Sequence, residues 1–247
     1  MNGHAIAYWI VGKGLIGSLV RLFVDFRSYG TERVPRSGGA VLAMSHLSYL
    51  DPPVYGTSCP RRIVFMAKVE LHETFGMSQL IRSHGTLAVR RGASDRDAIR
   101  LARETVRQNH LLGMFVEGTR QRHGEPGSAK PGAAMVAMNE GVPVVPAAVY
   151  GSHVWRWDRS PVSVAWGEPM RFDETPRNSK GYRAATAEIE SEIRRLWEFL
   201  RDLHALGRPS GTPPRREHVP FKLDPEKSGD SSGVRVGSPR LPFPPSS

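Results

Sequence analysis

Apolar runs and helical periodicities alternate through the middle of this chain of 247 residues. Consecutive apolar residues in the segments 62–67, 111–116 and 142–149 predict buried strands. Helical spacing begins at Lys130, and a second helical pattern covers residues 180–206. This alternation predicts an α/β fold, with a single domain in which a central mixed sheet is flanked by helices.

The N-terminal segment from Ala5 to Phe26 is apolar but interrupted. Its charged residues are Lys13, Arg21 and Asp25, which fall on one side at helical period. A spanning helix needs roughly 20 uninterrupted apolar residues, so the pattern favours an amphipathic helix lying in the plane of a membrane surface. The alternative is a helix packed on the core of the protein itself.

The C-terminal region changes character at Gly207. Residues 180–206 keep helical spacing and predict a terminal helix packed on the core. Proline, glycine and serine dominate from residue 208 onward, where apolar residues are few. This composition predicts that residues 207–247 form a disordered tail.

Charge and cysteine content limit the classes of partner. The formal net charge is +10, which favours a negatively charged partner. The basic residues are spread along the chain without a zinc-finger, basic-zipper or RNP-like signature, so we expect anionic lipids and phosphorylated substrates as partners and no nucleic acid. One cysteine, Cys59, excludes an intramolecular disulfide framework and fits a reducing compartment.

His46 and Asp51 stand five residues apart after a short apolar run, and Pro52 and Pro53 follow them. An imidazole can take a proton from an alcohol, and a nearby carboxylate can orient the ring and stabilise the imidazolium. The chain has no Gly-x-Ser-x-Gly nucleophile elbow, so the hydroxyl that reacts could belong to a substrate. In the structural alternative, Asp51 caps a helix that begins at the two prolines.

A second polar segment follows the strand predicted at 111–116. Gly118 allows a close backbone approach, Thr119 offers a hydroxyl, and Arg120 offers a planar fork that matches phosphate. The alternative is a solvated turn in which Glu117 pairs with Arg120. Lys68 and Arg91 also end apolar stretches and are candidate phosphate ligands, with the alternative that both are strand-end cations in water.

Four blocks of the chain, in order, resemble the glycerolipid acyltransferase family, typified by 1-acylglycerol-3-phosphate acyltransferase. They are Ser45 to Asp51, Gly85 to Arg91, Phe115 to Arg120 and Val142 to Pro146. The resemblance covers about residues 30 to 170. The chain departs from the family pattern at Ser45, where asparagine is usual, and at Arg90, where an acidic residue is common.

The resemblance implies a mechanism and a set of site residues. His46 would deprotonate the free hydroxyl of a lysophospholipid, and Asp51 would orient His46. The acyl donor would be an acyl thioester, either acyl-CoA or acyl carrier protein, with no cofactor and no metal. The family's acceptor-binding residues correspond to Arg91, Glu117, Gly118, Thr119 and Arg120, and Lys68 is added on position alone.

These inferences together predict the organisation and function of the chain. We expect a membrane-associating segment at 1–27, an acyltransferase domain at 28–206 and a tail at 207–247. The predicted enzyme is peripheral or monotopic on the cytoplasmic face of a membrane and acylates 1-acylglycerol-3-phosphate to phosphatidic acid. The alternatives are acylation of another lysolipid or of a glycolipid hydroxyl, a non-catalytic lipid-binding protein of the same fold, and a hydrolase in which His46 activates water.

Overall fold

A computed structural model of the chain describes residues 14, 17–68, 87–89, 95–156 and 158–216. Its centre is a seven-stranded sheet with the strand order β1-β7-β6-β2-β5-β3-β4. The strands are β1 (Asp25–Tyr29), β2 (Ala40–Met44), β3 (Ile63–Lys68), β4 (Leu87–Val89), β5 (Leu111–Phe115), β6 (Val144–Tyr150) and β7 (Pro161–Trp166).

Strand direction divides this mixed sheet into two parts. β6, β2, β5, β3 and β4 run parallel to one another, whereas β7 pairs antiparallel with β6 and parallel with β1. Met44 at the end of β2 lies opposite Phe115 at the end of β5. The loops that follow these two neighbouring strands therefore leave the sheet at the same edge, where parallel α/β sheets commonly bind ligands.

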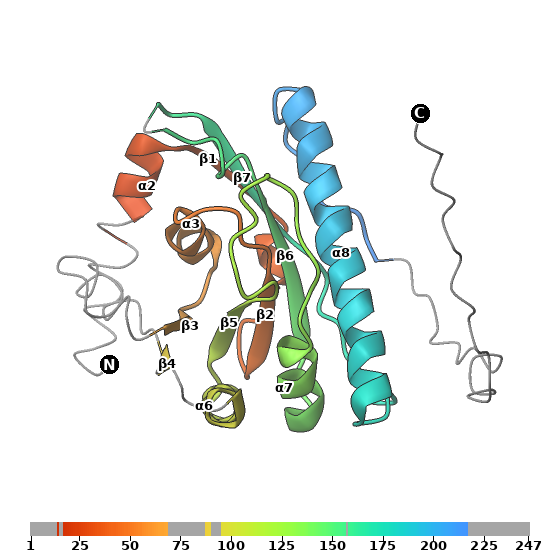
Figure 1. Cartoon of the computed structure of the whole chain (residues 1–247). Helices are drawn as coiled ribbons and strands as arrows, with labels where there is room; N and C mark the ends of the chain where they lie inside the picture. Colours follow the sequence, from red (N-terminus) through yellow and green to blue (C-terminus); the bar gives the residue numbers. More distant parts are fainter. Residues whose placement is uncertain (1–13, 15–16, 69–86, 90–94, 157, 217–247) are drawn as a thin grey trace, which may run out of the picture. The chain divides into compact units, whose positions relative to one another are not determined.

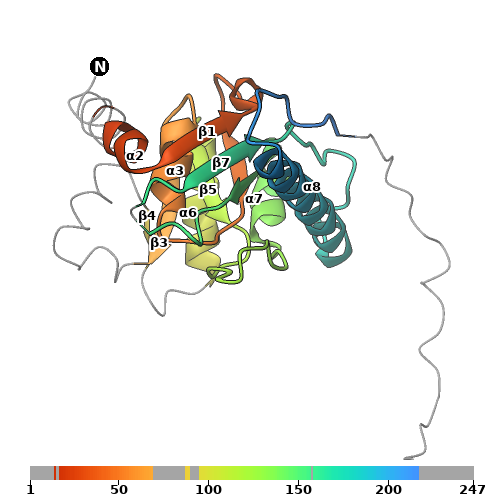
Figure 2. The same ribbon diagram turned by 90° about the horizontal axis from the view of Figure 1, so that it is seen from above.

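Helices cover both faces of the sheet (Figures 1 and 2). One face carries α6 (Asp95–Arg107), α7 (Gly132–Glu140) and α8 (Ser179–Ala205), and the other carries α2 (Gly17–Phe23) and α3 (Asp51–Ser58). A short 3-10 helix, η2 (Thr31–Arg33), follows β1. No helix in the described part of the chain is long and apolar enough to cross a membrane.

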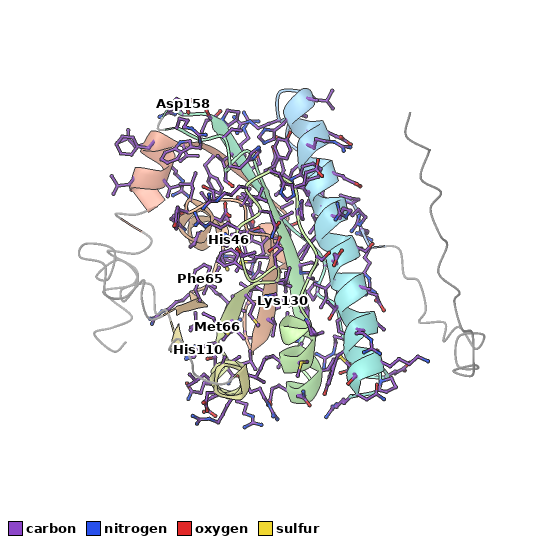
Figure 3. All side chains as sticks on the ribbon, in the orientation of Figure 1. His46, Phe65, Met66, His110, Lys130 and Asp158 are labelled. Carbon is purple, nitrogen blue, oxygen red and sulfur yellow. The ribbon has the colours of Figure 1, made fainter. Side chains whose placement is uncertain are left out.

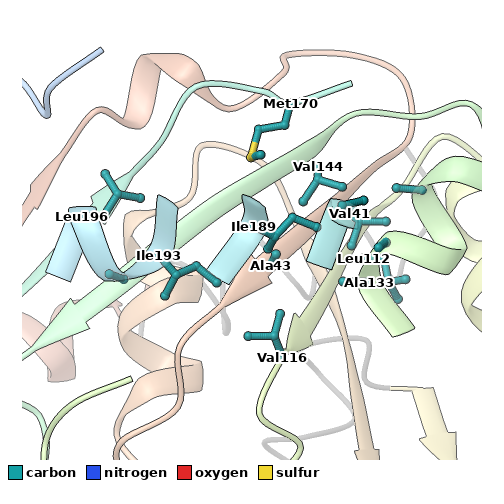
Figure 4. Packing of buried hydrophobic residues seen from close by; sticks show 14 of the residues in the cluster. Val41, Ala43, Leu112, Val116, Ala133, Val144, Met170, Ile189, Ile193 and Leu196 are labelled. Carbon is teal, nitrogen blue, oxygen red and sulfur yellow. The ribbon is translucent and has the colours of Figure 1, made fainter. Parts of the chain in front are cut away.

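Alternate residues of the strands supply two separate hydrophobic cores. In β2, Val41 and Ala43 face the core under α6, α7 and α8, whereas Ala40, Leu42 and Met44 face the core under α2 and α3. Figure 4 shows the first core, to which α8 contributes Ile189, Ile193 and Leu196. Burial on both faces explains why the parallel strands read as continuous apolar runs in the sequence.

Most predicted elements are confirmed. The apolar runs form β3, β5 and β6, and the two helical patterns form α7 and α8. α8 begins after Asn178, whose side-chain oxygen accepts hydrogen bonds from the backbone N–H groups of Lys180 and Gly181. The mixed sheet flanked by helices agrees with the predicted α/β fold.

The prediction of one helix from Ala5 to Phe26 is wrong at its C-terminal end. The described helix α2 ends at Phe23, and Asp25 begins β1, which pairs with β7 at an edge of the sheet. The predicted boundary at residue 27 therefore falls inside a strand. Backbone pairing with β7 outweighs the local helical pattern here, as tertiary context commonly does. Residues 5–13 lie outside the described residues.

The boundary predicted at Gly207 is also placed too early. The Arg208 guanidinium pairs with the carboxylate of Asp25 in β1, and the carbonyl of Arg208 accepts from Arg27. Arg33 donates to the carbonyl of Pro213 at 2.5 Å, and Arg216 pairs with Glu188 of α8. Residues 208–216 thus belong to the domain, because arginines bind the carbonyls of a segment that has few apolar side chains. The rest of the predicted tail, residues 217–247, lies outside the described residues.

Candidate active site

The candidate site lies at the sheet edge where β2 and β5 end. Ser45 and His46 follow β2, and the turn from Glu117 to Arg120 follows β5. The backbone N–H of Gln121 donates to the carbonyl of His46 at 2.7 Å, so the two loops are joined directly. Figure 3 labels His46 together with Lys130, a residue that precedes α7 on the chain that returns from this turn.

His46 and Asp51 are in direct contact. Nδ1 of His46 lies 2.9 Å from Oδ2 of Asp51, and the imidazole is 16% exposed whereas the carboxylate is fully buried. A carboxylate can only accept, so Nδ1 carries the proton and the lone pair of the neutral ring is on Nε2. Nε2 has no hydrogen-bond partner among the described residues, which leaves this nitrogen for a substrate.

The loop between the two residues wraps around the Asp51 carboxylate. The backbone N–H groups of Leu47 and Ser48 donate to Oδ2 at 2.6 and 2.7 Å. The helix α3 does begin at Asp51 with prolines in its first turn, as the structural alternative predicted. The carboxylate, however, accepts from the loop that precedes the helix and not from the helix itself. The same oxygen therefore holds both the loop and the His46 ring.

Aromatic packing fixes the plane of the His46 ring. The imidazole stacks on Phe115, the last residue of β5, with ring centroids 4.0 Å apart and an interplanar angle of 19°. Phe115 in turn stacks on Phe65 of β3 at 6.0 Å. The motif Phe-x-Glu-Gly-Thr-Arg thus places a ring under His46, a role that the sequence analysis did not assign.

Ser45 takes a structural role behind the base. Its hydroxyl accepts from the backbone N–H of Val149 in β6 at 3.1 Å and lies 3.3 Å from the hydroxyl of Tyr55. Tyr55 is fully buried in α3 and also donates to the backbone carbonyl of Ser45. Serine and tyrosine together connect β2, β6 and α3 at the position where the family usually has asparagine.

Glu117, which the sequence analysis predicted as an acceptor-binding residue, is buried beside His46. The residue is 3% exposed, and Oε1 accepts from the backbone N–H of His46 at 3.3 Å. Burial raises the pKa of Glu117 to about 7, and the negative charge of Asp51 contributes in the same direction. Oε2 of Glu117 and Oδ1 of Asp51 are buried without a hydrogen-bond partner among the described residues.

The turn after Glu117 is exposed. Gly118 has a left-handed backbone with φ of 69°, and a Cβ at this position would lie 2.9 Å from Nζ of Lys130. The backbone angle therefore favours glycine, whereas the flexible lysine side chain could move away from a Cβ. Thr119 is exposed at the same turn. Lys130, which the sequence analysis took only as a helix start, adds a cation to the predicted anion site.

Arg120 contacts an aromatic residue instead of the carboxylate of Glu117. Its guanidinium carbon lies 3.5 Å from the centroid of the Tyr49 ring, and Nη2 donates to the Tyr49 hydroxyl at 2.9 Å. The alternative of a solvated Glu117–Arg120 ion pair is therefore wrong, because Glu117 is turned into the protein. Tyr49 belongs to the loop between His46 and Asp51, so the guanidinium is held next to the base.

Two predicted phosphate ligands are only partly located. The backbone of Lys68 ends β3, which pairs with β5, so this residue reaches the same sheet edge as Glu117. Arg91 lies outside the described residues, two positions after the end of β4.

Among the described residues no group of three or more histidine, cysteine, aspartate or glutamate side chains could hold a metal ion.

His153 lies close enough to this region for its charge to interact with that of Asp51, and the sequence analysis missed it. It follows β6, the parallel neighbour of β2, and packs against Gly124 of the loop after β5. Burial lowers the pKa of His153, which keeps the ring neutral, although the charge of Asp51 opposes this shift. Only its position after a central strand could have indicated it.

The raised pKa of Glu117 predicts a pH-dependent stability. Between pH 4.5 and about 7, the folded chain holds a proton that an unfolded glutamate has released. The free energy of unfolding should therefore fall as pH rises through this window, by up to about 1.4 kcal/mol per pH unit. Glu117→Gln keeps an oxygen for the His46 N–H and should abolish this contribution.

Chemical denaturation of both proteins from pH 4 to 8 measures the effect. The stability of Glu117→Gln relative to the original chain should rise with pH and level off above pH 7. Glu32→Gln, which removes a carboxyl from an exposed position, serves as the control. A difference between Glu117→Gln and the original chain that is constant across the range would show that the Glu117 carboxyl has the same pKa in the folded and the unfolded chain.

Curated relatives share only part of their length with this chain. A 1-acyl-sn-glycerol-3-phosphate acyltransferase of Borreliella burgdorferi is 26% identical over 156 residues, which are 60% of this chain and 56% of the relative. A probable 1-acyl-sn-glycerol-3-phosphate acyltransferase of Mycoplasma pneumoniae is 33% identical over 128 residues, which are 49% of this chain and 47% of the relative. The chain spans about half the length of the curated relatives that it matches.

A solved structure agrees with the fold, and a family model matches the sequence. The crystal structure of the 1-acyl-sn-glycerophosphate (LPA) acyltransferase PlsC from Thermotoga maritima superposes with a TM-score of 0.64. It is 24% identical, and the match covers 86% of each chain, so the likeness concerns the fold. The sequence model of the acyltransferase family matches residues 25–150. Because this match takes in strands β1 to β6 and the loops that carry His46, Asp51 and Arg120, the chain belongs to the acyltransferase family.

Proposed function

We propose that this protein transfers a fatty acyl group from an acyl thioester to the free hydroxyl of a lysophospholipid, with 1-acylglycerol-3-phosphate as the acceptor and phosphatidic acid as the product. One observation carries the proposal. The unoccupied Nε2 of an oriented His46 lies in a loop whose Tyr49 holds the guanidinium of Arg120. A base for an alcohol and a ligand for a phosphate thus stand side by side.

The reaction uses His46 twice. Nε2 takes the proton of the acceptor hydroxyl as the oxygen forms a bond to the thioester carbonyl carbon. The carbon–sulfur bond then breaks, and the thiolate receives the proton from the imidazolium. The buried Asp51 carboxylate stabilises the imidazolium between these steps, because Nδ1 donates to it throughout.

The acceptor phosphate is bound by the cations of the site, among them the half-buried Arg120 and the exposed Lys130. Arg120 makes no ion pair with a carboxylate of a described residue, and Lys130 approaches the backbone of Gly118 in the same turn. Arg91 and Lys68 complete the proposed phosphate site. Thr119 and Gly118 supply a hydroxyl and an accessible backbone, whereas Glu117 acts from the interior through the backbone of His46.

The acyl donor is a thioester of coenzyme A or of acyl carrier protein, and the steps assigned to His46 and Asp51 require no cofactor. Both donors are acidic, which fits a chain with a net charge of +10. The rival functions are acylation of another lysolipid or a glycolipid, lipid binding without catalysis, and thioester hydrolysis. The orientation of His46 by Asp51 argues against a binding protein, which has no need of a base.

We further propose that the protein sits on the cytoplasmic face of a membrane through the N-terminal segment. In α2, Val20 is buried, whereas Leu19, Leu22 and Phe23 are exposed on the other side of the helix. Arg21 and, from the loop before β7, Arg159 are exposed nearby, and Arg159 donates to the carbonyl of Leu22 at 2.5 Å. Exposed apolar side chains with adjacent cations suit the interface of an anionic lipid layer.

Removing the base should abolish most turnover. General-base catalysis contributes typically about 10² to 10⁴-fold, so His46→Ala should lower kcat by roughly that factor while the acceptor still binds. Asp51→Asn should also lower kcat strongly, because an amide can present an N–H to Nδ1 and favour the wrong tautomer. The assay follows lipid product from labelled acyl-CoA with a panel of lysolipids.

His110→Ala is the matched control, since His110 is exposed and precedes β5 at the opposite edge of the sheet. Turnover of folded His46→Ala close to that of the original chain would refute the mechanism. Thioester loss that needs no added lysolipid would instead identify a hydrolase. A lipid product formed only from a different lysolipid would show that 1-acylglycerol-3-phosphate is not the acceptor.

The phosphate assignment predicts a change in acceptor affinity. Arg120→Lys keeps the charge but loses the planar fork and the stacking on Tyr49. Losing a charge-assisted bond to phosphate should cost on the order of 1.5 to 3 kcal/mol, which appears mainly as a raised acceptor KM. Arg91→Lys should act in the same direction. If neither substitution changes the acceptor KM, these arginines do not bind the phosphate.

Membrane attachment is tested on the exposed side of α2. Deleting residues up to Arg27 would also remove part of β1, so the double substitution Leu19→Ser with Leu22→Ser is the better change. It should weaken co-sedimentation with vesicles that contain an anionic phospholipid, by more than about tenfold if both side chains are buried in lipid. Leu206→Ser, at an equally exposed position after α8, should have no effect.

Salt distinguishes apolar anchoring from charge attraction. Screening shortens the reach of charge to about 3 Å at 1 M ionic strength, so apolar anchoring should persist at that salt concentration. Complete release of the original chain by salt, or equal binding of the double variant, would assign α2 to the protein core alone.

A further inference from the structure

Tyr49 is an exposed aromatic residue in the middle of the loop that carries His46 and Asp51. Its exposure of 69% means that burial in the core does not explain it. Among the described residues, its side chain stacks on and hydrogen-bonds to Arg120 alone. The contact therefore connects the loop after β2 with the turn after β5 at the surface of the site.

The backbone on each side of this contact is fixed. On the Tyr49 side, the N–H of Ser48 donates to Asp51 Oδ2 at 2.7 Å, and the N–H of Leu50 donates to the Ser48 hydroxyl at 3.3 Å. On the Arg120 side, the N–H of Gln121 donates to the carbonyl of His46. Both side chains thus extend from backbone segments that are hydrogen-bonded to the loop of His46. The guanidinium is therefore held at a constant place relative to His46.

An aromatic partner orients a guanidinium without neutralising its charge. Aspartate or glutamate at position 49 would also hold Arg120, but it would compete with a phosphate for the same N–H groups. The Tyr49 ring occupies one face of the guanidinium and its hydroxyl takes one N–H. Arginine has five N–H donors in one plane, so its remaining edge stays available for a bidentate phosphate.

We propose that Tyr49 is a positioning residue that holds Arg120 ready for the phosphate of the acceptor lipid. Because Tyr49 belongs to the loop that carries the base, the same contact sets the separation between phosphate site and base. This separation favours an acceptor whose free hydroxyl is close to a terminal phosphate along the glycerol backbone. The inference rests on the proposed function and names a determinant of its specificity.

The experiment compares Tyr49→Leu and Tyr49→Phe in the full chain. Steady-state acylation of a lysophosphatidate is measured with acyl-CoA, and binding of the same lysophosphatidate is measured without a donor. Tyr49→Leu loses ring and hydroxyl and should raise the acceptor KM and Kd by about fivefold to tenfold. Tyr49→Phe keeps the ring and should raise them by about twofold to threefold. The kcat and the donor KM should stay within about twofold of the original values.

A double substitution separates positioning from a direct role of the ring. When Arg120→Ala is already present, Tyr49→Leu should not change acceptor binding further, because no guanidinium is left to orient. The matched control is Arg201→Leu, which removes a guanidinium from above the Trp197 ring in α8 and should leave the acceptor KM unchanged.

The outcomes distinguish this inference from the proposed function. An unchanged acceptor KM in Tyr49→Leu, or a fall in kcat alone, overturns the positioning role, since damage to the loop would act through His46. An equal effect with and without Arg120 overturns it as well. If the original chain neither binds nor acylates any lysolipid with a terminal phosphate, both the positioning role and the proposed function are wrong.

Discussion

One carboxylate oxygen, Oδ2 of Asp51, accepts hydrogen bonds from His46 Nδ1 and from the backbone N–H groups of Leu47 and Ser48. These bonds bend the loop back on itself, so the His46 ring meets the carboxylate of Asp51, the first residue of α3. Two of the donors, the backbone N–H groups of Leu47 and Ser48, have no other acceptor among the residues that the structure describes. Losing the carboxylate would leave them unsatisfied, at a cost of about 1 to 3 kcal/mol for each buried group. The contact is thus a folding constraint first, and it orients the imidazole as a consequence.

The sheet determines what this loop meets. β2 and β5 are parallel neighbours with Met44 opposite Phe115, so the chain leaves both strands at the same level. The chain that follows Met44 in β2 leads to His46. The chain that follows Phe115 in β5 leads to the buried Glu117 and the half-buried Arg120. Phe115 packs under the imidazole, Glu117 accepts from the backbone of His46, and Gln121 donates to its carbonyl. A shift of β5 by one residue would move each of its side chains to the other face of the sheet, so that different side chains would face His46. The register of β5 therefore determines the geometry of the site.

The apolar runs predicted the central strands well because those strands are buried on both faces, and periodicity predicted α8 because one side of that helix is buried. The contact of His46 with Asp51 followed from spacing, although its catalytic role stays a prediction.

Three features could not be predicted from the sequence. β1 pairs with β7, and residues 208–216 are held by contacts with Asp25, Arg33 and Glu188, all of which are remote along the chain. The burial of Glu117 depends on how the turn leaves β5. The stacking of Tyr49 on Arg120 joins two segments that are 71 positions apart, and no local pattern reports such a contact.

The site separates its charges by depth, and this separation suits an anionic substrate. The carboxyl groups of Asp51 and Glu117 are buried, whereas the cations Arg120 and Lys130 reach the surface. Burial together with the charge of Asp51 raises the pKa of Glu117 to about 7, so near neutral pH a proton reduces the negative charge beside His46. Two fully ionised carboxylates at this depth would repel an incoming phosphate more strongly than one. With one of them protonated part of the time, the remaining charge on Asp51 still stabilises an imidazolium, while the positive edge of the site faces the substrate. The burial of Glu117 therefore also adjusts the electrostatic field around His46, the proposed base.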